Sequence, residues 1–225
     1  MTEDAKKDYN ILLLKVLAHD LLAPLTAVKW QAELLRKNYK KKDKRERYLG
    51  GIENSTELGI SLTKHAHVAA KVLSQSYELE VADNINLGAL IGKTVQELAQ
   101  QYERHALELK TAVAESVQKQ SVDASLLSLY VWSLGKFYLS STPPHITVNV
   151  NGEVQSEAGY TLNMFATGVP EGEACAQAFD DTVEFDAYDQ KYVFATLMKE
   201  VAPMINAKLE AHYKGDTLEV ITTFS

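Results

Sequence analysis

The stretch Leu17-Ala-His-Asp-Leu-Leu-Ala-Pro-Leu-Thr-Ala-Val-Lys-Trp-Gln-Ala-Glu-Leu-Leu35 carries the pattern that decides the fold. Apolar residues in and before it recur at alternating steps of three and four, at Ile11, Leu14, Ala18, Leu21, Leu25, Val28, Ala32 and Leu35. Such a seam is typical of a long helix packed nearly parallel to others in a bundle. His19 lies one position outside the seam, so we expect its imidazole at the bundle surface. Asp20 beside it can orient the ring or take up a proton.

The seam belongs to the first of two predicted helices, at about residues 6–38 and 45–77. Two antiparallel helices cannot bury both their faces alone, so we expect two chains to pair as a four-helix bundle, which makes the protein a homodimer. Residues 81–86 break the helical pattern. They mark the predicted boundary between a helical dimerisation domain, residues 1–80, and a second domain, residues 81–225.

The second domain alternates between helical and strand patterns. We predict helices at 87–105, 124–139, 174–179 and 189–211, and strands at 106–113, 145–150, 160–166 and 217–224. Strands on one side and helices on the other make a two-layer α/β sandwich. The predicted fold class is therefore α+β, a dimeric helical hairpin followed by a two-layer sandwich.

Composition and charge limit the compartment and the partners. The one cysteine, Cys175, excludes an internal disulfide framework and a multi-cysteine metal site, which fits a reducing cytoplasm. Residues 1–50 hold 12 Lys and Arg against 7 Asp and Glu, so the remaining residues hold 11 against 23. We interpret the basic run at 36–47 as the solvated turn of the hairpin rather than a nucleic-acid patch, because the rest of the chain is acidic.

No membrane insertion and no metal site are expected. The sequence has no run approaching the roughly 20 apolar residues of a membrane span. His65 and His67 lie on the second helix, without an acid or cysteine at ligand spacing, so we interpret them as packing or partly exposed residues.

The stretch around His19 resembles the phospho-acceptor box of sensor histidine kinases. The residues that fit the box are His19, Asp20, Pro24, Leu25 and Thr26. Two positions depart from it, since Leu22 stands where the family usually has Lys or Arg, and Ala23 where it has Thr or Asn. The resemblance implies that phosphatase activity is weak or absent.

Residues 86–91, 123–143 and 215–224 look like parts of the ATP-binding domain of histidine kinases. The family's two asparagines that hold Mg²⁺ and phosphate correspond to Ser133 and Phe137, and a phenyl ring offers no oxygen to a metal. The acid that reads adenine is absent from 165–170, as are the phosphate-binding glycines from 190–195. We therefore expect a degenerate domain that binds neither ATP nor another cofactor.

An acceptor box joined to a degenerate ATP-binding domain resembles the dimeric histidine phosphotransferases of phosphorelays. The resemblance implies that His19 carries phosphoryl groups between response-regulator aspartates, that Asp20 keeps its ring in the reactive tautomer, and that the partner receiver domain supplies Mg²⁺. Candidates for receiver contacts, expected near His19 on the exposed side of the helix, are Lys15, Val16, Leu22 and Lys29. Two alternatives remain, a pseudokinase adaptor that binds receivers or kinases without phosphotransfer, and an active kinase with a divergent site.

Overall fold

Two long helices form an antiparallel hairpin at the start of the chain. The computed structural model describes residues 3–38, 40–114, 119–156, 159–180 and 189–224. Helix α1 spans Glu3–Asn38 and passes through Pro24 without ending, and α2 spans Lys42–Leu73. The hairpin is held by apolar residues that face the other helix or the second domain, which include Leu13, Val16 and Leu17 of α1 and Leu58 and Leu62 of α2.

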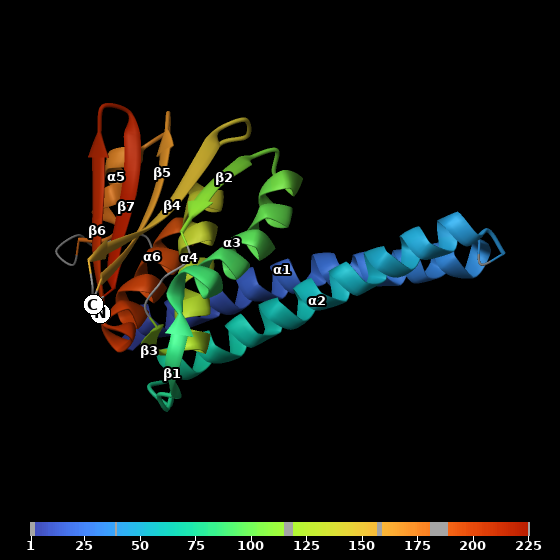
Figure 1. Cartoon of the computed structure of the whole chain (residues 1–225), viewed down its shortest axis with the longest axis horizontal. Helices are drawn as coiled ribbons and strands as arrows, with labels where there is room; N and C mark the ends of the chain where they lie inside the picture. Colours follow the sequence, from blue (N-terminus) through green and yellow to red (C-terminus); the bar gives the residue numbers. More distant parts are fainter. Residues whose placement is uncertain (1–2, 39, 115–118, 157–158, 181–188, 225) are drawn as a thin grey trace.

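The hairpin extends well beyond the rest of the molecule (Figure 1). Its closed end, with the basic turn, lies far from the sheet, whereas its open end packs against helices of the second domain. His19 lies near the middle of α1, and its neighbour Asp20 contacts Lys136 of the second domain. No helix in the described part of the chain is long and apolar enough to cross a membrane.

The second domain is a five-stranded mixed sheet with helices on one face. The strand order is β2 (Glu108–Val113), β4 (Thr147–Ser156), β5 (Gly159–Thr167), β7 (Thr217–Phe224) and β6 (Ala207–Lys214). Only the β2–β4 pair is parallel among these neighbours. Helices α3 (Leu87–Arg104), α4 (Ala124–Ser141) and α6 (Gln190–Val201) lie between this sheet and the hairpin (Figure 1), and the short α5 (Gly172–Gln177) packs on β6 and β7. The predicted α+β class, a helical hairpin followed by a two-layer domain, is confirmed.

Helix α4 is the central element of the molecule. Asp123 caps its N-terminus by accepting hydrogen bonds from the backbone N–H groups of Ser125 and Leu126. The same carboxylate accepts from the Tyr77 hydroxyl at 2.9 Å and the Glu80 N–H at 2.8 Å, which ties the segment after α2 to α4. Residues 126–127 and 129–138 of α4 are all buried, so every face of the helix has a neighbour.

The structure differs from the predicted elements in two places. The single helix expected at 189–211 ends at Val201, continues as the 3₁₀ turn η1 (Ala202–Ile205), and gives way to strand β6. Pro203 and the left-handed backbone of Asn206 account for the break. Residues 81–86, predicted as a domain boundary that breaks the helical pattern, were not assigned to a strand, yet they form strand β1 (Val81–Asn86), which pairs with the unpredicted β3 (Lys119–Asp123) in a separate two-stranded sheet.

Candidate functional site

His19 projects from α1 into solvent. Its side chain is 87% exposed, as the seam predicts, and Nδ1 lies 3.5 Å from Oδ1 of Asp20. No other polar side chain among the described residues pairs with the imidazole. In the tautomer with its proton on Nδ1, beside this carboxylate, Nε2 carries the lone pair that a partner could use.

Asp20 lies between His19 and a buried lysine of the second domain. Its Oδ2 is 2.6 Å from Nζ of Lys136 on α4, and the side chains of Asp20 and Lys136 are 18% and 9% exposed. This is a close ion pair between opposite charges, although its angles are not those of a hydrogen bond. Sequence analysis missed Lys136, although a lone charge inside an otherwise apolar helix could have indicated a buried ionic partner.

The predicted receiver-contact residues do not all share one surface. Leu22 is 63% exposed and Lys29 is exposed, in agreement with the expectation for this part of α1. Val16 was expected on the same exposed side and is instead buried, because it faces the core shared with α2 and the second domain. The side chain of Lys15 lies outside the described residues.

The two positions that correspond to metal-binding asparagines are occupied by buried residues. The Ser133 hydroxyl donates to the backbone oxygen of Leu129 at 2.8 Å, four residues earlier in α4. The Phe137 ring packs edge-on against Phe179 and Tyr138, with ring centroids 5.0 Å and 5.6 Å apart. Both positions are fully buried, so neither offers an oxygen ligand to a metal.

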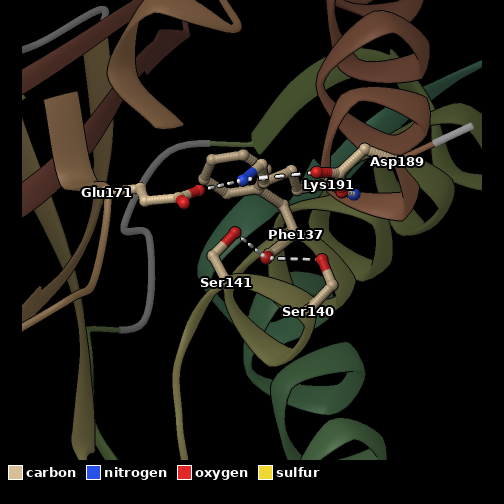
Figure 2. Close-up of polar contacts among 6 residues, drawn as sticks. All are labelled: Phe137, Ser140, Ser141, Glu171, Asp189 and Lys191. Carbon is tan, nitrogen blue, oxygen red and sulfur yellow. Dashed lines mark hydrogen bonds and ion pairs between the residues drawn. The ribbon is translucent and has the colours of Figure 1, made fainter. Parts of the chain in front are cut away.

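A compact ion cluster lies beside this end of α4. Nζ of Lys191 is 2.9 Å from Oε2 of Glu171 and 3.3 Å from Oδ2 of Asp189, as Figure 2 shows next to Phe137. Burial by itself lowers the pKa of Lys191, but the two carboxylates outweigh it and raise the pKa above its ordinary value. The positive charge of Lys191 is therefore balanced by the carboxylates of Glu171 and Asp189.

These residues do not fit a magnesium–nucleotide complex. Phe137 replaces a ligand with a ring, Ser133 is hydrogen-bonded within its helix, and Lys191 is paired with two acids. Among the described residues, no group of three His, Cys, Asp or Glu side chains could hold a metal ion. Cys175 is buried, and burial raises the pKa of its thiol, so it has the character of a structural residue.

His65 connects the hairpin to α4. It is 5% exposed, its ring stacks on Trp132 at a centroid distance of 5.1 Å, and Nε2 lies 3.0 Å from the Ser128 hydroxyl. Burial, with a smaller contribution from Lys64, lowers the pKa of His65 to about 4. The predicted packing role of His65 is confirmed, and His67 is exposed.

No protein-family model and no curated protein sequence matches this chain. Solved structures do match over its whole length. A bacterial phosphotransferase has a TM-score of 0.57 and 15% identity, covering 99% of this chain and 97% of that one. A histidine kinase from Burkholderia phymatum STM815 has a TM-score of 0.51 and 18% identity, with coverage of 100% and 99%.

The Acinetobacter baumannii histidine kinase AdeS has a TM-score of 0.52 and 12% identity, covering 92% of this chain and 97% of that one. The fold is that of the histidine kinases. The resemblance drawn from the sequence is thereby confirmed at the level of the fold, for the hairpin and the sheet domain together.

Proposed function

We propose that this protein is a histidine phosphotransferase of a two-component phosphorelay, which works without ATP. His19 accepts a phosphoryl group from the aspartyl phosphate of one receiver domain and donates it to the aspartate of another. The observation that carries the proposal is the contrast between two sites on one chain. His19 is exposed beside Asp20. By contrast, Phe137 stands at a position that corresponds to a metal-binding asparagine of the histidine kinases, and the ion cluster of Lys191 lies next to it.

The transfer needs no proton to leave the attacking nitrogen. With Nδ1 protonated beside Asp20, the Nε2 lone pair forms the N–P bond while the P–O bond to the donor aspartate breaks. The electron pair of that bond leaves with the donor carboxylate. The phosphorylated ring then carries a positive charge next to the Asp20 carboxylate, which stabilises it. The reverse sequence returns the phosphoryl group to a second receiver.

The receiver domain brings the Mg²⁺ that its aspartyl phosphate requires, and it docks on the surface around His19. Leu22 offers an exposed apolar contact there and Lys29 a positive charge. The protein acts as a homodimer, because the outward part of the seam is apolar and unpaired in the single chain. Leu14 and Leu25 are 60% and 55% exposed, and Ala18 between them and Ala32 beyond Leu25 are exposed as well.

Transfer of label from a phosphorylated receiver tests the proposal. We expect the protein to become labelled in the absence of ATP, and His19→Ala to remain unlabelled with an unchanged thermal midpoint, since an exposed side chain contributes little to stability. Leu22→Ala is the matched control, because it changes the proposed docking surface but keeps His19, the residue that carries the phosphoryl group. If no receiver of the source organism labels the wild type, and one binds His19→Ala equally well, the protein is an adaptor instead.

A further inference from the structure

We infer that Lys136 is a positioning residue for phosphoryl transfer, through which the degenerate sheet domain takes part in the chemistry at His19. The inference rests on the proposed function, because it assigns Lys136 a role in that reaction. Lys136 acts through Asp20 and has no described contact with the imidazole.

The two oxygens of the Asp20 carboxylate face different partners. Oδ1 of Asp20 faces Nδ1 of His19 at 3.5 Å, and Oδ2 faces Nζ of Lys136 at 2.6 Å. Oδ2 is buried, and among the described residues it has no hydrogen-bond donor with good geometry, so the ion pair with the Lys136 ammonium group is its one polar contact. A carboxylate fixed at one oxygen cannot turn freely about its side-chain bond, so Lys136 determines where the other oxygen points. Lys136 therefore selects the histidine tautomer with Nδ1 protonated and Nε2 free.

The burial of the lysine makes this arrangement obligatory. Nζ of Lys136 is carried on a side chain that is 9% exposed, within a helix whose neighbouring residues are buried and mostly apolar. A buried ammonium group without a partner is strongly unfavourable, so the folded state is more stable when Asp20 stays beside Lys136. His19, by contrast, is 87% exposed and has no packing of its own to fix its ring. Its orientation depends on Asp20, and that of Asp20 depends on α4.

Rates of phosphoryl transfer from a phosphorylated receiver test the coupling. We expect Lys136→Met to slow the first-order transfer step by roughly 10- to 100-fold, the range in which groups that orient a functional histidine contribute. Lys136→Arg should stay within a few-fold of wild type, because a guanidinium group can make the same ion pair. In a chain that already carries Asp20→Asn, adding Lys136→Met should change the rate less than twofold. The double variant leaves neither an unpaired carboxylate nor an unpaired ammonium group at this contact, so we expect it to be more stable than either single variant, and urea unfolding of all three checks that each is folded before its rate is compared.

A purely structural lysine gives a different pattern. If the double variant is ten times slower than Asp20→Asn alone, Lys136 does not act through Asp20, and the inference fails. The tautomer of His19 provides a readout that needs no receiver. In protein labelled with ¹⁵N at histidine, with His19→Ala used to assign the signal, we expect wild type and Lys136→Arg to show Nδ1 protonated.

Asp20→Asn and the double variant should show a shift toward the other tautomer. The same tautomer in all of these proteins would overturn the inference. If the tautomer shifts as expected while no receiver labels the wild type, the positioning role stands and the proposed phosphotransferase function is what fails.

Discussion

Phe137 is a single side chain on which the proposed loss of nucleotide binding depends. Its ring lies at a position that corresponds to a metal ligand, and it is fully buried against Phe179 and Tyr138. Removing the ring opens space inside the core, but it does not supply an oxygen ligand, an acid for adenine or a glycine for phosphate. Stability and nucleotide binding should therefore respond separately to a change at this residue.

We predict that Phe137→Ala lowers the free energy of unfolding by about 3–5 kcal/mol, the usual cost of truncating a buried aromatic residue. Neither this variant nor the wild type should bind Mg²⁺–ATP with a dissociation constant below ~1 mM, which corresponds to about −4 kcal/mol. Urea unfolding measures the first effect and titration calorimetry the second. Binding of ATP to the wild type at micromolar concentration would contradict the prediction and restore the kinase alternative.

Helix α1 presents two apolar surfaces that lie side by side. Leu25 belongs to the heptad seam, whereas Leu22 lies three residues away in the region of His19, and both are more than half exposed in the single chain. We predict that Leu25→Asp converts the dimer to a monomer at micromolar protein concentration, because a carboxylate in the seam would be buried without a partner. Leu22→Asp should remain dimeric. Light scattering after size-exclusion chromatography distinguishes the two.

A monomeric wild type, or an equal effect of the two aspartates, would show that the seam does not form the interface. The comparison is informative because the substitutions are identical in charge and nearly identical in exposure. Only their position relative to the heptad pattern differs.

Some elements could be predicted because their patterns reflect burial on one face. The seam of α1 and the alternating strand β7 are of this kind, and both elements are observed. Strand β1 could not be predicted, because its residues are mostly exposed and give no alternation of apolar and polar side chains. Strand β6 does alternate, with Ala207, Leu209, Ala211 and Tyr213 half-buried, so Pro203 together with this period-2 pattern was the signal that the helix had ended.

The candidate site was predictable only within one helix. His19 and Asp20 are neighbours in sequence, so a local pattern is enough to bring them together. Lys136 comes from a different domain, and its pairing with Asp20 depends on how α4 packs against the hairpin. Val16 was misplaced for a similar reason, because it belongs to the core that α1 shares with α2 and the second domain, and the heptad seam of α1 alone does not show this.

At the scale of the whole molecule, the contact between the hairpin and the sheet domain contains a titratable group. The folded-state pKa of His65 is about 4, below its ordinary value of 6.5. As the pH falls below 6.5, the unfolded chain takes up a proton that the folded protein does not. The contribution of neutral His65 to the free energy of unfolding is therefore fully present above pH 6.5, and it is lost progressively as the pH falls to about 4.

We predict that this histidine reduces the free energy of unfolding by about 3 kcal/mol between pH 6.5 and pH 4. His65→Phe keeps a ring against Trp132 and cannot take up a proton. The Ser128 hydroxyl keeps its hydrogen bond with the Thr94 hydroxyl, at 3.2 Å. Urea unfolding at several pH values should thus show a weaker pH dependence for His65→Phe than for wild type. The exposed His67, changed to Phe, is the matched control and should leave the dependence intact. Identical profiles for all three proteins would refute the assignment.

The burial of Phe137 also has an evolutionary consequence. Changing it to asparagine would remove the ring that packs against Phe179 and Tyr138 and leave a cavity in the core, so that step alone costs stability. The benefit would appear only after an adenine-reading acid and phosphate-binding glycines had also returned. Natural selection acts on one substitution at a time, and a path that begins at Phe137 begins with a loss of stability. The proposed loss of ATP binding would therefore be hard to reverse from this core.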